Sequence, residues 1–252
     1  MGRPLAGRRV LVVGASSGIG AALARAVVAA GGDVAVSARR ADRLDELVAS
    51  MGTGHALSGD ATDLDDARSV VDGAVSAMGG LDLLVYVAGY GVLQPLAETD
   101  PTTWVDVFRV NVVGANVMAA AALPHLGSDG IAAFVSSRTV DDANPLFATY
   151  STTKAALDQS IRVWRHEHPD RRFVRIVMGN TAPTEFAEHM RPELLGDALE
   201  AWQGLGIPGG LMDVDDVGRA LAESLAVALD HPDIDSSEIR FDARPHFGES
   251  GA

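Results

Sequence analysis

Short apolar runs alternate with helical patterns along most of the chain. The first run, RVLVVG (9–14), is continuously apolar and ends in glycine, which is typical of a strand buried on both faces of a sheet. The stretch 18–32 follows with Ile19, Leu23 and Val27 at spacings of four, and two glycines end it as a helix would end. The other strand-like runs are DVAVSA (33–38), HALSGD (55–60), LDLLVYVAG (81–89), IAAFVSS (131–137), RFVRIVMG (172–179) and SEIRFDA (237–243).

Helical stretches lie between most of these runs. One begins near Asp100, a good N-cap residue, and Pro101, which suits the first helical position. Another covers about 150–166. This alternation predicts an α/β fold of the doubly wound, Rossmann type, with a parallel sheet and helices on both faces. Ligands of such sheets bind beyond the carboxyl ends of the strands.

The stretch 184–212 interrupts the alternation late in the chain. It carries several glycines with apolar residues between them, and long irregular segments in compact domains are often functional. We therefore expect one domain over 1–252, with 184–212 as a small substrate-binding lid or, equally, an ordinary pair of surface helices.

Composition narrows the function classes. Hydrophobic residues make up 47% of the 252 residues, enough for one sizeable core. The formal net charge of −14 disfavours nucleic-acid binding, because an acidic surface repels phosphates. The chain has no cysteine, so disulfides and thiolate chemistry are excluded. No metal site is predicted, because His125, His166 and His168 lack partners at metal-ligand spacing.

The chain is expected to be cytoplasmic and not bound to membranes. Its first residues run into the buried-strand pattern without a separate apolar signal segment. No stretch is expected to be long and apolar enough to span a bilayer.

The first strand leads into a glycine-rich turn, GASSGIG (14–20). Glycine permits the sharp turn and a close backbone approach, and the N-terminus of the following helix favours an anion such as a pyrophosphate. The alternative is a tight turn without a ligand. The predicted cofactor-binding residues here are Gly14, Ser16, Ser17, Gly18, Ile19 and Gly20.

The end of the second strand suggests which dinucleotide is bound. An NAD site usually has an acid here for the ribose 2′-OH, whereas this chain has Arg39 and Arg40. Guanidinium groups suit a 2′-phosphate through charge-assisted bonds. NADP(H) is therefore the preferred cofactor, with NAD(H) as the alternative. If the two arginines have no binding role, they are simply solvated side chains on the surface.

A pair of functional side chains is expected on the helix at 150–166. Tyr150 and Lys154 are four residues apart, which places them on one helix face. Lys154 is the only lysine in the chain, whereas 19 basic residues are arginine. A neighbouring ammonium favours a phenolate, so Lys154 is expected to lower the pKa of Tyr150 toward values useful in proton transfer.

Together these motifs resemble the classical short-chain dehydrogenase/reductase family over nearly the whole chain. GASSGIG resembles its cofactor loop, YSTTK its catalytic Y-x-x-x-K, and FVSS the strand end that carries its catalytic serine, here Ser137. The resemblance also implies that Asn111, in RVN, completes a catalytic tetrad and fixes a water that relays protons to Lys154. It assigns Asp60 and Ala61, in GDATD, to the adenine, and Ala88, Gly89 and Thr184 to the cofactor.

The chain departs from the family pattern at two places. Tyr86 and Val87 replace the two asparagines of the family's N-N-A-G, so those polar contacts must be made otherwise or lost. Gly179 and Asn180 stand where many members have P-G beside the nicotinamide. These departures bear on cofactor geometry more than on the chemistry.

The resemblance implies an oxidoreductase that interconverts a ketone or aldehyde and an alcohol. Tyr150 would donate the proton, Ser137 would hold the substrate oxygen, and Lys154 would also bind the nicotinamide ribose. A non-catalytic NADP(H) sensor and an epimerase or dehydratase without net redox chemistry are the alternatives. The substrate is expected to be a small molecule, which the sequence does not identify. The family resemblance also implies a homo-oligomer, a tetramer or dimer, formed through the helices at 101–123 and 150–166. Six apolar residues are available for a substrate pocket or could equally belong to the core: Leu93, Pro145, Leu146, Phe147, Trp202 and Leu205.

Overall fold

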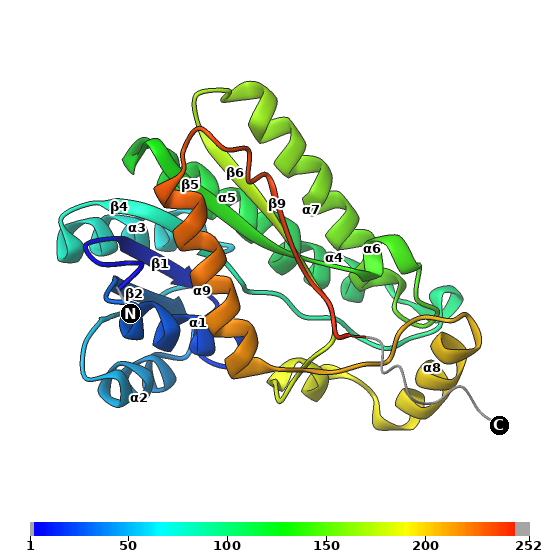
Figure 1. The fold of residues 1–252 in the computed structure, drawn as a ribbon. Coiled ribbons are helices and arrows are strands. Elements are labelled where there is room, and N and C mark those ends of the chain that lie inside the picture. Colours follow the sequence, from blue (N-terminus) through cyan, green and yellow to red (C-terminus); the bar gives the residue numbers. More distant parts are fainter. Residues whose placement is uncertain (1–2, 245–252) are drawn as a thin grey trace.

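A computed structural model describes residues 3–244 of the chain (Figure 1). Within these residues, seven parallel strands form one sheet in the order β3-β2-β1-β4-β5-β6-β9. The chain winds outward from β1 to β3 and then returns past β1 to β4, which confirms the predicted doubly wound topology. The strands are β1 (Arg9–Val13), β2 (Asp33–Ala38), β3 (His55–Ser58), β4 (Leu81–Tyr86), β5 (Leu126–Ser137), β6 (Arg172–Met178) and β9 (Glu238–Phe241).

Helices cover both faces of this sheet (Figure 1). On one face, α1 and α9 pack against each other and bury an aliphatic core with the sheet. On the other face, α3, α5 and α7 bury a second core that includes Tyr86 and Phe134. The helices of the two layers are α1 (Gly18–Ala29), α2 (Ala41–Met51), α3 (Leu64–Met78), α4 (Pro101–Phe108), α5 (Ala115–Ala122), α7 (Ala148–Glu167) and α9 (Val214–Asp230).

The register of the central strands determines which loops meet. Val13 of β1 pairs with Tyr86 of β4, which in turn pairs with Phe134 of β5. On the other side of β5, Ser137 pairs with Met178 of β6. The segments that follow β1, β4, β5 and β6 therefore emerge at one edge of the sheet, where a doubly wound fold binds its ligand.

The helical run that follows β4 changes its hydrogen-bonding pattern along its length. The Asp100 carboxylate caps α4 by accepting a bond from the Thr103 amide at 3.0 Å, with Pro101 in the first turn as predicted. Between α4 and α5 the backbone widens into a π-helix, η2 (Arg109–Gly114), and a short 3₁₀ turn, η3 (Leu123–His125), ends the run. The widening has no counterpart in the sequence pattern.

The same helix corrects one expectation about membranes. The run Pro101–His125 is 25 residues long and contains an 18-residue window with a mean hydropathy of 1.4, so a stretch long and apolar enough to span a bilayer does exist. The fold gives a different explanation for its apolar composition. Helix α5 packs on α3, and η2 packs on α7, so much of the run belongs to the core.

The 184–212 segment is ordered into short elements. It contains a 3₁₀ helix, η4 (Glu185–His189), and an α-helix, α8 (Pro192–Gly204). Strands β7 (Thr181–Ala182) and β8 (Met212–Asp213) pair at its two ends, so a small parallel sheet closes its base. A one-turn helix, α6 (Thr139–Asp142), links the end of β5 to the loop before α7.

Candidate active site

The glycine loop after β1 is folded as a close-packed turn. The amides of Gly14 and Ala15 donate to the Ser37 carbonyl at 2.7 and 3.1 Å, and Gly14 has a φ of 90°. A methyl group at Gly14 would overlap the backbone of Ala88, and one at Gly20 would overlap the Gly14 carbonyl oxygen. These glycines therefore let the loops after β1 and β4 meet at the start of α1.

The beginning of α1 keeps its donors available for an anion. Ser17 is the N-cap residue, but its side chain makes no capping bond to the helix. The first amides of a helix lack intrahelical partners, and the helix dipole favours negative charge there. Gly18 lies so close to Thr184 that a methyl group at Gly18 would be 3.3 Å from the Thr184 Cβ. The structure thus brings together two residues predicted to bind the cofactor, whereas Ile19 packs into the α1 core.

A carboxylate already occupies the basic side of this loop. The Arg40 guanidinium donates to Ser16 Oγ at 2.8 Å, to Ser17 Oγ at 3.3 Å and to Glu185 Oε2 at 2.7 Å. The bond from Arg40 lowers the pKa of Glu185. The Glu185 carboxylate is here a chemical stand-in for an anionic phosphate. Arg40 and the two serines therefore fit a phosphate group, and the neighbouring Arg39 is exposed beside them.

The predicted adenine residues lie after β3. Asp60 Oδ1 accepts bonds from the amide and hydroxyl of Thr62 at 2.9 and 2.7 Å, which fixes the turn that carries Ala61. Arg109 lies 3.8 Å from the other Asp60 oxygen. Asp60 and Ala61 are therefore held at the same edge of the sheet, although Asp60 has structural bonds of its own.

The predicted catalytic residues converge beside the loop after β4. A methyl group at Gly89 would lie 2.9 Å from Asn111 Oδ1 and 3.2 Å from Lys154 Nζ. Asn111 is fully buried; its Oδ1 accepts from the Tyr90 amide, and its Nδ2 donates to the Tyr90 carbonyl and to Thr153 Oγ1, all at about 3 Å. Its side chain therefore ties the β4 loop to α7, a bracing role that the family resemblance does not mention.

Ser137 and Tyr150 face each other from β5 and α7. Ser137 is the last residue of β5, and its Oγ accepts bonds from the Thr139 amide at 3.2 Å and the Thr139 hydroxyl at 3.0 Å. A hydrogen bond also joins the side chains of Ser137 and Tyr150. Because a serine hydroxyl has one proton to donate, Thr139 directs that proton toward the tyrosine side of the site.

Burial controls the protonation of Tyr150. Desolvation raises the pKa of Tyr150 to about 12, and the bond to Ser137 offsets this only in part. The expectation that Lys154 brings this pKa down is therefore wrong for this structure. The physical reason is that removing a phenolate from water disfavours the charged form more strongly than its neighbours favour it.

Lys154 is also buried, and its ammonium is held by backbone. Lys154 Nζ donates to the Val135 carbonyl of β5 at 2.8 Å and lies 5.6 Å from the centre of the Tyr150 ring. Burial lowers the pKa of Lys154 to about 8, and the negative charge of Asp158 works against this lowering. Asp158 is itself paired with Arg175 at 2.7 Å. Near neutral pH, Lys154 is thus a charged donor close to its titration point.

An aromatic cluster packs around Tyr150. Phe147 stacks on the Tyr150 ring at 4.6 Å, and Phe186 meets it edge to face at 5.1 Å. Trp202 of α8 lies 5.8 Å from Phe147, and its indole N–H donates to the Pro145 carbonyl at 2.8 Å. Leu93 and Leu146 belong to the same cluster, as anticipated, but Leu205 is 63% exposed and lies outside it.

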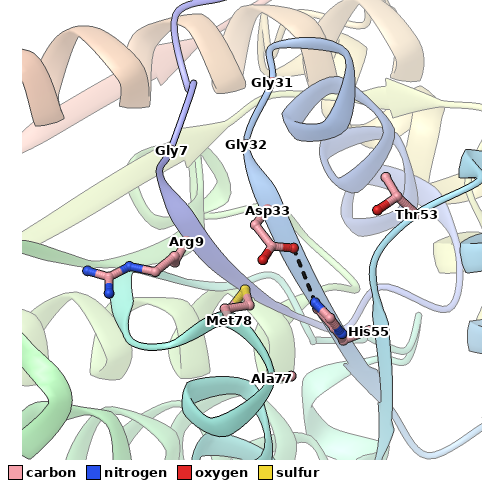
Figure 2. Close-up of a pocket in the computed structure, with 9 residues that line it drawn as sticks. All are labelled: Gly7, Arg9, Gly31, Gly32, Asp33, Thr53, His55, Ala77 and Met78. Carbon is pink, nitrogen blue, oxygen red and sulfur yellow. Dashed lines mark ion pairs between the residues drawn. The ribbon is translucent and has the colours of Figure 1, made fainter.

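A separate cavity lies at the far edge of the sheet. It measures about 590 Å³ and is lined by Arg9, Asp33 and His55, the first residues of β1, β2 and β3 (Figure 2). On its wall, His55 Nε2 lies 3.2 Å from Asp33 Oδ1. This cavity is at the amino ends of the strands, opposite the edge where the predicted site residues gather.

Four residues of the site escaped the sequence reasoning. Thr139 directs Ser137, Thr153 links Asn111 to the Tyr150 carbonyl, Glu185 pairs with Arg40, and Phe186 covers Tyr150. Thr153 and Thr139 stand one and two residues from predicted catalytic positions, so their hydroxyls could have been suspected. The other two contacts join residues distant in sequence and carry no local signal.

Comparisons with known proteins agree with this geometry. A family model described as short chain dehydrogenase matches residues 8–195. An uncharacterised oxidoreductase of Methylorubrum extorquens is 35% identical over 187 residues, which are 72% of this chain and 75% of that protein. A short chain dehydrogenase of Pseudocercospora fijiensis is 35% identical over 163 residues, but the match spans only about half of its length, 53%, and 62% of this chain.

A solved structure extends the match to nearly the whole fold. A short chain dehydrogenase from Burkholderia cenocepacia J2315, in complex with NADP, superposes with a TM-score of 0.80 at 27% identity, covering 95% of this chain and 98% of that one. The chain belongs to the short-chain dehydrogenase family. Its sheet and helices form the Rossmann-type fold of that family.

Proposed function

We propose that this protein is an NADP(H)-dependent oxidoreductase that interconverts a ketone or aldehyde and an alcohol. The observation that carries the proposal is the convergence of Ser137, Tyr150, Lys154 and Asn111 at the carboxyl edge of the sheet, next to the loop of Gly89. A sensor that only bound the cofactor would not need a serine proton directed at a buried tyrosine.

Several features support NADP(H) as the cofactor. The glycine loop and the start of α1 offer backbone donors, and Arg40 with Ser16 and Ser17 already holds the carboxylate of Glu185. A phosphate is a stronger acceptor for the same donors. The similar protein of Burkholderia cenocepacia was solved with NADP. When bound, the nicotinamide supplies the hydride.

The side chains supply the proton and hold the oxygen. In carbonyl reduction Tyr150 is protonated, because its pKa of about 12 keeps the phenol intact at neutral pH. Ser137 holds the carbonyl oxygen by a hydrogen bond and keeps its own proton, while Tyr150 transfers one proton to that oxygen. The Lys154 ammonium then stabilises the phenolate left behind. Lys154 lies near Asn111, which by the family resemblance would fix the water through which a proton returns.

The decisive experiment is an NADPH-coupled screen of ketones and aldehydes with the wild-type protein and Tyr150→Phe. We expect NADPH consumption with at least one carbonyl, and loss of about 10²–10⁴-fold in kcat in the variant, the range of general acid catalysis. Tight NADPH binding without any turnover would favour the sensor. Turnover of a substrate without loss of NADPH would favour an epimerase or dehydratase.

The aromatic cluster supports an apolar substrate and a lid role for 184–212. Phe186 and Trp202 reach the Tyr150 side of the site from this segment, and the paired strands β7 and β8 hold its base. Movement of η4 and α8 about that base would expose the cluster to a substrate. A ketone or aldehyde with an apolar or aromatic body fits such a lining better than a charged one.

The outer faces of α4 and α7 support the predicted homo-oligomer. Val105 is 63% exposed there, and Phe108 and Val163 are each 42% exposed. A second copy of the chain would cover these side chains, since apolar patches on soluble proteins commonly mark interfaces. Light scattering of the purified protein measures the assembly directly, and Val163→Asp should shift it toward the monomer.

A further inference from the structure

Tyr86, which stands where the family pattern has its first asparagine after β4, has a specific hydrogen-bond partner. Tyr86 is the last residue of β4 and is fully buried in the core between the sheet and α5. Its hydroxyl donates to the Val110 carbonyl at 2.7 Å. Burial raises the pKa of Tyr86 well above its usual range, so the phenol remains a donor throughout the working pH range.

Val110 lies in the π-helix η2, where the bonding pattern of the backbone changes. In a π-helix each carbonyl accepts a hydrogen bond from the amide five residues later in the chain, instead of four residues later as in an α-helix. Such turns are often found at functional sites. The residue four positions after Val110 is Gly114. A methyl group at Gly114 would overlap the Tyr86 hydroxyl oxygen. Gly114 thus leaves the space that the Tyr86 hydroxyl fills.

The residue next to Val110 is Asn111, and its contacts lead to the proposed catalytic helix. Asn111 bonds both backbone groups of Tyr90 and the hydroxyl of Thr153, and that hydroxyl donates to the Tyr150 carbonyl at 2.8 Å. A backbone shift of Val110 would move Asn111 directly. The chain of contacts then runs from β4 through the π-helix to the helix that carries Tyr150 and Lys154.

We infer that Tyr86, together with Gly114, is a positioning residue: its hydroxyl bond to Val110 holds η2 in the π form that places Asn111 between Tyr90 and Thr153. The lost asparagine of the family pattern is thereby replaced by a longer side chain that reaches the helix instead. The kinetic part of this inference rests on the proposed function, but the structural part does not.

Hydrogen exchange of Tyr86→Phe tests the structural part. The Tyr90 amide, bonded to Asn111 Oδ1, reports on the placement of Asn111, and the Val87 amide, bonded to the Val13 carbonyl at 2.8 Å, reports on the end of β4. We expect Tyr90 exchange to rise about tenfold while Val87 stays within twofold. Equal increases at both amides, or none at Tyr90, would overturn the inference.

A paired substitution tests the role of Gly114. Gly114→Ala should lower the melting temperature strongly, because the new methyl meets the Tyr86 hydroxyl. In the Tyr86→Phe background the same change should be less harmful, since the overlapping hydroxyl is gone and the nearest remaining atom is Thr62 Cγ2 at 3.2 Å. Additive effects of the two changes would contradict the pairing, even if Tyr86→Phe alone folded poorly.

The kinetics separate positioning from general stability. In Tyr86→Phe, kcat for carbonyl reduction should fall about tenfold at a temperature where the variant is folded, with the KM for NADPH within twofold. Ser224→Ala is the control, because its hydroxyl also donates to a helix carbonyl, that of Ala220 at 2.8 Å, but on the opposite face of the sheet. An unchanged kcat in Tyr86→Phe would show that Tyr86 has only a structural role and would refute the inference. If the wild type reduces no carbonyl, the proposed function fails, and the exchange experiment still decides the inference.

Discussion

The two halves of the candidate site differ in polarity and in exposure to solvent. The half formed by the loops after β1 and β2 is polar, close to the surface and rich in backbone donors, with Arg40 reaching over Ser16 and Ser17. The half around Tyr150 is apolar and covered by side chains of the 184–212 segment, Phe186 and Trp202 among them. The first half suits one charged ligand group shared by many enzymes. The second suits a substrate that differs from one enzyme to another.

This contrast makes separable predictions. Substitutions on the polar half should change cofactor affinity and leave the substrate constants alone, whereas substitutions in the aromatic cluster should do the reverse. Lys154 lies between the halves and should affect both.

The largest effect is expected for Lys154→Arg. The space around the ammonium is closed, and a guanidinium cannot reproduce its compact bond to the Val135 carbonyl. We expect kcat for carbonyl reduction to fall about 10²-fold or more, within the range of lost acid–base catalysis. Steady-state kinetics with saturating NADPH measure it, and retention of most of the activity would refute a specific need for lysine.

Lys154 also gives a pH dependence. Its pKa is lowered to about 8, so the ammonium is present below that pH and is lost above it. In reduction, kcat/KM should therefore decrease as the pH rises through about 8. The residual activity of Lys154→Arg should show no such decrease, since the guanidinium stays charged. A wild-type profile that is flat between pH 7 and 9 would contradict this assignment.

The next effect concerns the polar half. Arg40→Ala should weaken NADPH binding about tenfold to a hundredfold, as expected for a lost charged hydrogen bond, and weaken NADH binding by less than about threefold. Fluorescence titration measures both. Arg25→Ala is the matched control, because Arg25 is an exposed arginine two turns into α1. Equal losses for the two cofactors would remove Arg40 from the 2′-phosphate site.

A smaller effect is expected from the aromatic half. Phe186→Ala removes the edge-to-face contact with Tyr150 and should raise the KM of an apolar carbonyl about threefold to tenfold. NADPH affinity should not change. Leu205→Ala in the same segment provides the control, since Leu205 is exposed outside the cluster. A change in NADPH affinity as large as the change in the substrate KM would contradict the prediction that the aromatic half affects the substrate alone.

The smallest effect should come from Glu185→Gln. The Glu185 carboxylate competes with a phosphate for Arg40, so its neutralisation should tighten NADPH binding about twofold to fivefold, the size of an exposed ion pair. The difference should shrink as salt is added. Glu188→Gln, an exposed glutamate of the same short helix, is the comparison. Weaker NADPH binding by Glu185→Gln would show that the carboxylate supports the site instead.

Much of the fold could be predicted because its signals are local. Buried strands, the Asp100 cap and the glycine turn each occupy a few consecutive residues, and the order of strands follows from the family of the fold. The convergence of Asn111, Ser137 and Lys154 was anticipated from the resemblance, and the structure brings them together; their roles stay predictions.

The missed features depend on distance in sequence or on burial. The bond from Tyr86 to Val110 crosses 24 residues, and that from Arg40 to Glu185 crosses 145. Neither leaves a periodic pattern. The pKa of Tyr150 was expected to move in the opposite direction, because a sequence names the nearby charge but does not reveal how completely the phenol is removed from water.

Strand β5 imposes a further consequence on how this chain can vary in length. The Val135 carbonyl contacts Lys154 and the Ser137 hydroxyl contacts Tyr150, both residues of α7, while Ser136 between them is fully buried. Side chains of a strand alternate between faces, so a one-residue shift of register exchanges them. One residue inserted between Ile131 and Ser136 would put Ser136 in the place of Ser137, and one residue deleted there would put Arg138 in it. A library of single-residue insertions and deletions across the protein should therefore find almost no active member in these few positions. The exposed stretch Gly127–Asp129, at the other end of the same strand where its pairing with β4 is irregular, should tolerate them.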